Sequence, residues 1–377
     1  MSIHCVIDKE NFLEILAGVQ NVTSKKNTMA LLANILLQLE NSTLTITATD
    51  MEVGLQFNME AAEITAGSIT LPSKKLYEII KVSSSDFIEI KEMENNWVMI
   101  TAGPSTYNLA GMASAEYPKF PKREKAGYTR IASAIFLELI DRTQNSIAGE
   151  QENIYSLTSA LIDIEEKNGE TLIRMVSSDG HRLSVMEKIT SNEILKLKSD
   201  DGLILVPRRG IQEMKKYCEN RDEIEICLEN SQFFISDSKS MLVIRLKKGE
   251  YPPYKSIIET IQRKYRVTVE REKFIESLVR SDLFTQDTYH TIRIDLGRDS
   301  MTLSSENIEL GSSKEELPMS YNGEEFSLGF NCLYFIETLE VMEGETVYMD
   351  LDGKDSACCF TSEADHGFLS IIMPMNI

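Results

Sequence analysis

The chain has 377 residues, of which 42% are hydrophobic and 26% charged, a composition that suits two or three globular domains. Its 39 Lys and Arg against 59 Asp and Glu give a formal net charge of −20, which as a global sum argues against a nucleic-acid binder. A binding surface is local, however, and most of the excess acid lies after residue 264.

One sequence pattern occurs three times along the chain. Each copy begins with a short β-like entry, continues with a polar stretch, and reaches a Phe followed by aliphatic residues at helical spacing. The copies are "VIDKENFLEILAGV" from Val6, "RIASAIFLELIDRT" from Arg130 and "TVEREKFIESLVRS" from Thr268. The predicted apolar helix faces carry Phe12, Ile15, Leu16 and Val19; Phe136, Leu139 and Ile140; and Phe274 and Leu278.

After this helix, each copy continues with an alternating strand that ends in a polar turn. A further strand, a turn and a second helix come next. Two more alternating strands close the copy, such as "DFIEIKEM" with "NWVMITAG". Ser73 or Asn331 could cap a second helix, and Pro207 lies near the start of another. The first strands are predicted at 43–50, 171–179 and 300–307, and the strand–turn–helix segments at 68–82, 202–218 and 326–341.

The first two copies also end alike, with "AEYPKFP" at 115–121 and "GEYPPY" at 249–254. A polar connector follows each, at 122–128 and at 256–264, and we expect the domain boundaries there. The predicted fold class is α+β, and because the links between strands are short we expect antiparallel sheet to dominate. The predicted domains are 1–126, 127–264 and 265–377.

The motifs of several chemistries are missing. There is no G-x-G-x-x-G, no G-K-[ST] and no G-x-S-x-G, so nucleotide-loop and nucleophile-elbow functions are not indicated. The four histidines are scattered and no Cys/His spacing suits zinc. We therefore expect no metal, no cofactor and no catalytic activity.

The segment "SSDGHRLSV" at 177–185 contains the one conspicuous cluster of reactive side chains. A hydrolase that uses Asp179 and His181 is the alternative hypothesis. The segment takes the place of "ATDMEVGLQ" in the first copy and "SENIELGSS" in the third, which offer no matching catalytic pair. We therefore expect a turn between strands, with Gly180 at positive φ and with His181 and Arg182 projecting onto a groove.

The compartment can be inferred from three features. No apolar run approaches the ~20 residues of a membrane span. The opening "MSIHCVIDKE" lacks the basic and long apolar regions of a secretory signal. The cysteines form no C-x-x-C pair and fall in apolar runs, so we expect reduced, mostly buried thiols. We expect a soluble cytoplasmic protein with no membrane partner. The six cysteines are Cys5, Cys218, Cys227, Cys332, Cys358 and Cys359.

Two short motifs, "DGHRL" at 179–183 and the C-terminal "MPM" at 373–375, are specific together. They stand within "SSDGHRLSV" and "IIMPMNI", and further characteristic stretches are "LLANILLQL", "TATDMEV", "LPSKKLYEI", "VPRRG", "GEYPPY" and "LGFNCLYFIETL". Through these stretches the chain resembles, over nearly its whole length, the β subunit of bacterial DNA polymerase III, the sliding-clamp family.

The resemblance implies a DNA-clamp fold, with three repeated domains that each pack two helices on antiparallel sheets. It implies a head-to-tail homodimeric ring of six domains that encircles duplex DNA and gives the replicative DNA polymerase its processivity. The implied partners are the polymerase α subunit, an ATP-driven clamp loader, and other polymerases and repair proteins that bind through short linear motifs. The clamp itself catalyses nothing and needs no cofactor.

A helix count supports a dimer. Six helices spaced ~10 Å apart around a ring give a diameter of about 19 Å, which leaves about 9 Å after the helix thickness is removed. A duplex has a radius of ~10 Å, so it cannot pass. Twelve helices leave roughly 28 Å, which admits the duplex.

Basic side chains on the predicted lining helices would face the DNA without reading its sequence. The second helix of the third copy, "NCLYFIETLEV", breaks this pattern because it has no Lys or Arg. The expected DNA-facing residues are Lys25, Lys26, Lys74, Lys75, Lys81, Tyr155, Arg208, Arg209, Lys215, Lys216 and Arg280, with Arg271 and Lys273 on the same helices.

The resemblance also implies a pocket for partner peptides between the second and third domains. Relatives often carry Arg where Ser256 and Asn376 stand, so we expect less charge at the rim. They often carry Thr where Ser178 stands, which is a mild change. Arg182 and the backbone near Gly180 are the expected polar anchors, and the binding should be weak and insensitive to salt. The expected pocket residues are Leu157, Ser178, Gly180, His181, Arg182, Leu183, Pro252, Ile257, Asn331, Tyr334, Asp355, Ala357, Ile371, Met373, Pro374 and Met375.

Overall fold

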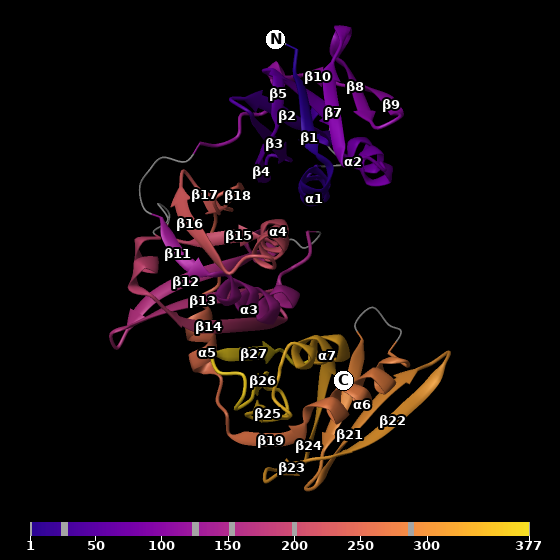
Figure 1. The fold of residues 1–377 in the computed structure, drawn as a ribbon. Coiled ribbons are helices and arrows are strands. Elements are labelled where there is room, and N and C mark those ends of the chain that lie inside the picture. Colours follow the sequence, from indigo (N-terminus) through magenta and orange to yellow (C-terminus); the bar gives the residue numbers. More distant parts are fainter. Residues whose placement is uncertain are drawn as a thin grey trace. The chain divides into compact units, whose positions relative to one another are not determined.

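The computed structural model describes residues 2–23, 29–122, 128–150, 155–197, 202–285 and 290–376. The chain forms two compact units (Figure 1). The first consists of residues 1–132, 196–200 and 212–246, and the second of residues 133–195, 201–211 and 247–377. The predicted central domain is therefore divided between the two units.

The first compact unit contains two antiparallel sheets. The five-stranded sheet has the order β5 (Ala62–Thr65), β1 (His4–Asp8), β7 (Phe87–Glu92), β8 (Trp97–Ala102) and β9 (Ser105–Ala110). The nine-stranded sheet has the order β10 (Met112–Ala113), β6 (Gly67–Pro72), β2 (Asn34–Glu40), β3 (Thr43–Thr49), β4 (Val53–Glu60), β18 (Ser240–Arg245), β17 (Gln232–Ser236), β16 (Glu223–Glu229) and β11 (Thr129–Ala132).

Two helices, α1 (Lys9–Val19) and α2 (Ser73–Val82), pack against each other in this unit. The predicted apolar face of α1 is confirmed, because Phe12, Leu16 and Val19 are fully buried. The side chain of Asp8 caps α1 by accepting a hydrogen bond from the Asn11 amide at 2.9 Å.

The second compact unit also contains two antiparallel sheets. The nine-stranded sheet has the order β15 (Ile204–Pro207), β12 (Ser159–Lys167), β13 (Glu170–Ser178), β14 (Arg182–Thr190), β27 (Phe368–Ile372), β26 (Cys358–Thr361), β25 (Thr346–Leu351), β19 (Tyr265–Glu270) and β23 (Ser320–Tyr321). The four-stranded sheet has the order β22 (Gly311–Pro318), β21 (Ser300–Asn307), β20 (Thr291–Leu296) and β24 (Phe326–Asn331).

The helices of the second unit follow the repeat, with one addition. On α3, the side chains of Phe136, Leu139 and Ile140 are buried, and on α6 those of Phe274 and Leu278 are buried, as the pattern predicts. A short helix occupies the first half of the connector predicted at 256–264, and its Tyr254 is buried. The helices are α3 (Ser133–Thr143), α5 (Tyr254–Thr260), α6 (Arg271–Asp282) and α7 (Cys332–Glu340), and α4 (Arg208–Cys218) contributes residues to both units.

The predicted caps have mixed outcomes. Asn331 caps α7, since its side-chain oxygen accepts from the Tyr334 amide at 3.2 Å. Ser73 does not cap α2, because it is the first helical residue and lies buried behind Pro72. Pro207 directly precedes α4, as expected.

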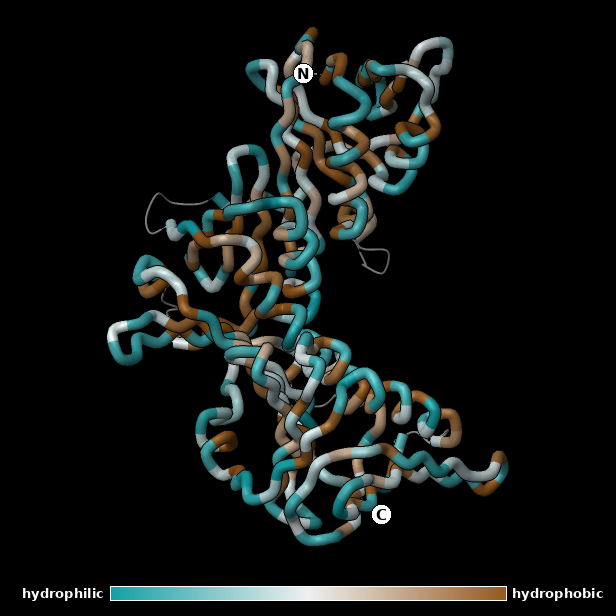
Figure 2. Tube along the Cα trace, turned by 60° about the horizontal axis from the view of Figure 1, so that its bottom comes forward, coloured by the Kyte–Doolittle hydropathy of each residue, from teal (hydrophilic) through white to brown (hydrophobic). Residues whose placement is uncertain are grey.

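Apolar residues concentrate in the strands and inward helix faces of each unit (Figure 2). All six cysteines are buried and free of disulfides, as predicted. Burial raises the pKa of the Cys5, Cys218 and Cys359 thiols to about 12. Within the described ranges, no helix is long and apolar enough to cross a membrane.

Candidate functional site

The conspicuous segment at 177–185 forms the turn between β13 and β14. The Asp179 carboxylate accepts hydrogen bonds from the backbone amides of His181, at 3.0 Å, and Arg182, at 2.9 Å. The Ser178 hydroxyl donates to the Arg182 carbonyl at 2.7 Å and accepts from the Gly180 amide at 3.1 Å. Gly180 has a φ of +89°, as predicted, and a side chain there would be strained.

The corresponding turn is capped in the same way in all three repeats, although the third turn is one residue longer, because Asn307 pairs with Gly311 whereas Asp50 pairs with Val53. Asp50 accepts from the amides two and three residues later, at 3.0 and 2.8 Å, and Asn307 does so at 2.9 and 3.1 Å. A side-chain oxygen that accepts from its own turn in this way stabilises the turn. Asp179 therefore has a structural role that Asp50 and Asn307 share, and the predicted equivalence of the three segments is confirmed.

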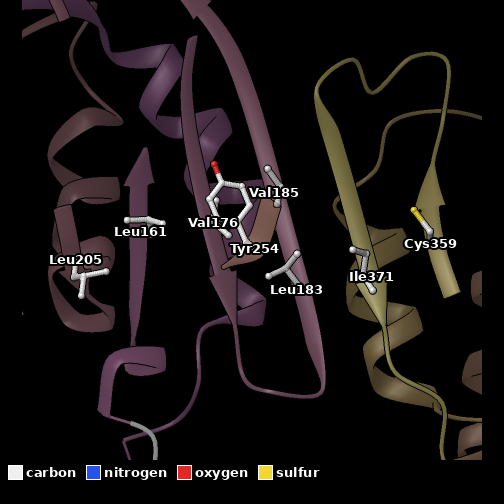
Figure 3. Packing of buried hydrophobic residues seen from close by; sticks show 8 residues of the cluster. All are labelled: Leu161, Val176, Leu183, Val185, Leu205, Tyr254, Cys359 and Ile371. Carbon is white, nitrogen blue, oxygen red and sulfur yellow. The ribbon is translucent and has the colours of Figure 1, made fainter. Parts of the chain in front are cut away.

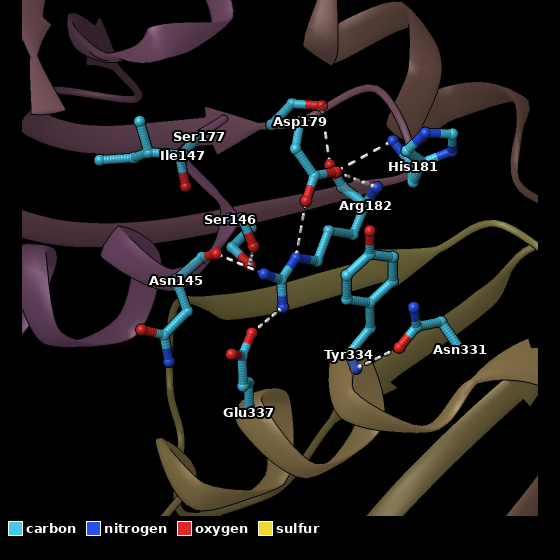
Figure 4. Close-up of polar contacts among 12 residues, drawn as sticks. Asn145, Ser146, Ile147, Ser177, Asp179, His181, Arg182, Asn331, Tyr334 and Glu337 are labelled. Carbon is cyan, nitrogen blue, oxygen red and sulfur yellow. Dashed lines mark hydrogen bonds and ion pairs between the residues drawn. The ribbon is translucent and has the colours of Figure 1, made fainter. Parts of the chain in front are cut away.

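The hydrolase hypothesis is not supported. Both oxygens of Asp179 are used within the chain, one by the turn and the other by the Arg182 guanidinium at 3.0 Å (Figure 4). His181 is exposed and contributes its backbone amide, not its ring, to the contact with Asp179. In the part of the chain that the structure describes, no group of three His, Cys, Asp or Glu side chains could hold a metal ion.

Arg182 does not project into a groove as predicted. Its side chain is 8% exposed, and its guanidinium donates to Asp179, to the Asn145 carbonyl and to Glu337 of α7 (Figure 4). The guanidinium carbon also lies 4.2 Å from the centre of the Tyr334 ring. Arg182 thus holds the 179–182 turn to α7, and it is wrong to treat it as a free polar anchor for a ligand.

The C-terminal segment runs beside this turn. β27 pairs with β14, with Leu183 opposite Ile371 and Arg182 opposite Ile372. The Met373 amide then donates to the His181 carbonyl at 2.8 Å, and the Met375 amide donates to the Gly329 carbonyl at 2.8 Å. The side chain of Met373 remains about half exposed. The backbone is therefore fixed on both sides of an apolar side chain that faces solvent.

An apolar cluster lies behind the turn and the C-terminal segment. Leu183 of β14 and Ile371 of β27 are two of its eight buried members (Figure 3). Ala357 and Ile258 pack against it from the edge, and Tyr251 donates from its hydroxyl to the Val176 carbonyl at 3.1 Å. The buried members are Leu161, Val176, Leu183, Val185, Leu205, Tyr254, Cys359 and Ile371.

The predicted pocket residues all belong to the second compact unit. They differ in exposure, so some could line a surface and others only support it. The exposed ones are Gly180, His181, Asp355 and Met373; the half-buried ones are Pro252, Ile257, Asn331, Tyr334, Ala357, Pro374 and Met375; the buried ones are Leu157, Ser178, Arg182, Leu183 and Ile371.

Two partners of the site were missed by sequence reasoning. Glu337 accepts from Arg182, and the Asn145 carbonyl accepts from the same guanidinium. Both lie far from the turn in sequence and carry no motif. α7 is the second helix of the third repeat, which has no Lys or Arg. Its Glu337 forms an ion pair with Arg182, so this helix contributes an acidic side chain to the site.

Most of the predicted DNA-facing side chains occupy three helices, and several of them pair with neighbouring carboxylates. On α2, Lys74 and Lys75 both pair with Glu78, while Lys81 is exposed in the last turn. Such exposed pairs are worth at most about 1 kcal/mol, so a phosphate could replace the carboxylate.

The basic residues of α4 and α6 differ more in their partners: some pair with carboxylates and others donate to backbone carbonyls. Lys216 pairs with Glu213, and Arg280 pairs with Glu315. Arg208 donates to the Ile147 carbonyl, and Arg271 donates to the Leu339 and Gly344 carbonyls, so both stabilise the fold. Arg209 and Lys215 are half-buried and Lys273 pairs with Glu270. Lys25, Lys26 and the side chain of Tyr155 lie outside the described residues.

Comparisons with known proteins agree with this architecture. The chain is 28% identical to the β sliding clamp of Pseudomonas aeruginosa over 99% of this chain and all of that one, and 27% identical to the clamp of Haemophilus influenzae over 98% and 99%. A crystal structure of the P. aeruginosa clamp matches with a TM-score of 0.89 at 27% identity, over the full length of both chains. A Caulobacter crescentus clamp matches the fold with a TM-score of 0.93 at 23% identity, also over both full lengths.

Family models match in chain order. They are the N-terminal domain of the DNA polymerase III β subunit at residues 3–121, the central domain at 130–253 and the C-terminal domain at 260–376. Together they account for nearly all of the sequence, and the chain belongs to the DNA polymerase III β subunit family.

Proposed function

We propose that this protein is a DNA sliding clamp. Two copies form a closed head-to-tail ring around duplex DNA and hold the replicative DNA polymerase on its template, and the protein is not itself an enzyme. The main support for the ring is that strands in equivalent positions of the three repeats are not all paired within the chain. Two of three equivalent strand pairings occur within the chain, and the strands for the third are left at sheet edges.

Each pairing joins two successive repeats. In the first joint, β4 of the first repeat pairs with β18, the last strand of the second repeat. In the second joint, β14 of the second repeat pairs with β27, the last strand of the third. The equivalent strands that remain are β22, which follows the third turn, and β9, which ends the hairpin of the first repeat.

Both remaining strands are edges of their sheets, β22 of the four-stranded sheet and β9 of the five-stranded sheet. Unpaired edges of this kind invite pairing with another chain. A third joint between β22 of one chain and β9 of a second copy is heterologous, and it closes after two chains if the ring has six domains.

Apolar exposure supports the third joint. α6 packs against β22, and Val279 and Leu283 at its C-terminal end are exposed large hydrophobics. Because exposed aliphatic side chains beside an open strand edge gain from burial, α6 and β22 together form a suitable face for a second copy.

The charge distribution of the chain favours weak contacts with the DNA backbone. The exposed bases of α2, α4 and α6 carry carboxylate partners that phosphates could replace, and the net charge of −20 disfavours tight equilibrium binding. The DNA is therefore held by enclosure, and the contacts permit sliding.

Partner proteins bind through a short apolar peptide at the second joint. The peptide lies over Met373, Pro374 and Met375, with Gly180 and Ala357 leaving space beside them. Methionine adapts to several ligand shapes, so the site suits the polymerase, the clamp loader and repair proteins. With Arg182 committed to Glu337 and uncharged Ser256 and Asn376 nearby, the peptide affinity should change little with salt.

The proposed clamp domains are 1–126, 127–264 and 265–377. The first boundary falls in the gap between matched family models at 122–129, whereas the second lies five residues beyond the gap at 254–259. Free, buried cysteines suit a reducing cytoplasm.

Multi-angle light scattering tests the ring. We expect a dimer at micromolar concentration whose population is unchanged when a polymerase-derived peptide is added. A protein that stays monomeric at tens of micromolar would contradict the closed ring.

A further inference from the structure

The side chains at the three joints differ although the backbone repeats, and this inference rests on the proposed ring. The residue that follows the capping Asp or Asn of each turn is Met51, Gly180 or Ile308. In the third repeat this residue is fully exposed, at 102%, and Leu310 of the same turn is 52% exposed. Figure 2 shows the brown end of the β21–β22 hairpin. At this hairpin tip, one aliphatic side chain is therefore fully exposed and a second is half exposed.

The opposite side of each joint can be aligned through its strand contacts. Met375, Lys247 and Met112 form bridges with Gly329, Leu205 and Thr70, respectively. Each of these three partners lies two residues before the end of the equivalent strand, β24, β15 or β6. Met112 in the first repeat therefore corresponds to Met375 in the third.

The same alignment relates Trp97 to Ala357. Trp97 pairs with Ala110, two residues before Met112. Cys358 pairs with Ile372, so the antiparallel register places Ala357 opposite Met373, two residues before Met375. Trp97, the only tryptophan of the chain, is 48% exposed and Met112 is 42% exposed.

The second and third joints thus differ in side-chain volume at matching positions. The second joint has Gly180 and Ala357, which leave space for a ligand. The third joint would have Ile308 and Trp97, which fill the same space. All four apolar side chains of the third joint are substantially exposed in one chain, and bringing them together removes this surface from water.

We propose that Ile308 and Leu310 of one chain pack against Trp97 and Met112 of a second copy, forming an apolar clasp that closes each of the two joints between chains. The clasp occupies at the third joint the place where the second joint binds a peptide. Its charged neighbours on both sides are acidic, Glu309 beside the tip and Glu94 before Trp97. Added salt therefore screens repulsion and does not weaken the dimer.

The test is a dilution series of the full-length protein by analytical ultracentrifugation, at low and high salt. The Ile308→Ser, Leu310→Ser double variant should raise the dimer dissociation constant about 10,000-fold, because two contacts are lost at each of the two joints, each worth roughly 1.5 kcal/mol, and each tenfold change corresponds to about 1.4 kcal/mol. Both residues lie at an exposed tip, and circular dichroism should confirm an unchanged fold.

Two other exposed isoleucines provide matched controls. Ile64 lies in β5, at the edge of its sheet opposite β9, and Ile189 lies in β14. Ile64→Ser and Ile189→Ser should leave the dissociation constant within about twofold of the wild-type value, since neither position belongs to the proposed third joint between chains.

The outcomes separate the clasp from the ring. A wild-type protein that never dimerises overturns both. A wild-type dimer that the double variant leaves intact, or that salt dissociates steeply, overturns the clasp and leaves the ring standing. A specific loss in the double variant, reproduced by Trp97→Ala on the other face, is the expected result.

Discussion

The two joints within the chain share a backbone and differ in their side chains. In the first joint the Arg245 amide donates to the Glu52 carbonyl at 2.8 Å, and in the second the Met373 amide donates to the His181 carbonyl at 2.8 Å. Strand pairing and turn geometry also match. The first joint presents Met51 and Arg245 where the second presents Gly180 and Met373. On one scaffold, small and apolar residues at the proposed peptide site of the second joint therefore replace the large and charged residues of the first.

The joints also differ beneath the turn. The buried Val53 starts β4, whereas Arg182 starts β14 with its bonds to Asp179, Asn145 and Glu337. The apolar residue needs no partner, but the buried guanidinium needs all of its partners. The second joint thus depends on an ion network that the first does not have.

Removing that network should have the largest effect. Arg182→Ala leaves Asp179 without its charged partner and should destabilise the second compact unit by about 3 kcal/mol. Hydrogen exchange of the β14 and β27 amides measures this loss directly. Arg130→Ala, which breaks the exposed Arg130–Glu225 pair, is the control and should cost under about 1 kcal/mol. Equal effects of the two variants would mean that the network is not what holds the second joint.

The exposed methionine should dominate peptide affinity. Met373→Ala keeps the backbone bond to His181 and removes an apolar contact, so binding of a polymerase-derived peptide should weaken about 30-fold. Fluorescence polarisation gives the affinity. Arg245→Ala changes the matching position of the first joint and should leave the peptide affinity unchanged. A peptide that binds both variants as tightly as the wild type would place the partner site elsewhere.

Exchanging the residues at the turn sharpens the comparison. Met51 has a φ of 78°, a conformation that costs a side chain about 1 kcal/mol, so Met51→Gly should change stability little or raise it. Gly180→Met should cost about 1 kcal/mol and also obstruct peptide binding, because a Cβ at this position lies 3.9 Å from the predicted pocket residue Leu157 and the longer side chain would fill the open space beyond it. Urea titration and fluorescence polarisation report the two effects. Tight peptide binding by Gly180→Met would show that the space beside the turn is not used.

The smallest expected effect is the pH dependence of the folding stability that Glu165 contributes. Hydrogen bonds from Arg174 and then Lys255 lower the pKa of Glu165 from about 4.5 to about 2. A carboxyl whose pKa is lower in the folded state stabilises it above pH 4.5, and this contribution disappears as the pH falls from about 4.5 to about 2. Glu165 is more than a third exposed, so Glu165→Gln should cost under about 1 kcal/mol at pH 7. Urea midpoints at pH 7 and pH 2 should differ from wild type only at the higher value; an equal deficit at both would contradict the charge explanation.

Most of the fold could be predicted from the sequence because each repeat is marked by patterns of residues that are close together in the chain. Phe12, Phe136 and Phe274 mark three helices, and the turns at Asp50, Asp179 and Asn307 follow from short-range hydrogen bonds. The capping role expected of Ser73 fails because capping depends on where the chain enters the helix, which a side chain alone does not decide.

The candidate site was harder to predict because its polar contacts are long-range. The sequence identifies Arg182 as conspicuous, but its role depends on Glu337, 155 residues later, and on a backbone carbonyl at Asn145. No local pattern marks either partner. The apolar part, with Leu183 and Ile371 in paired strands, was easier because strand alternation already predicts which side chains are buried.

The most direct test of the sliding clamp is retention on DNA of different topology. Clamps are loaded onto nicked circular DNA, the free protein is removed by gel filtration, and half of the sample is linearised with a restriction enzyme. Because the proposed ring encloses the duplex and contacts it weakly, the clamps should stay on the circle and leave the linear molecule through its ends. Equal retention on both forms, or release from both, would contradict topological enclosure.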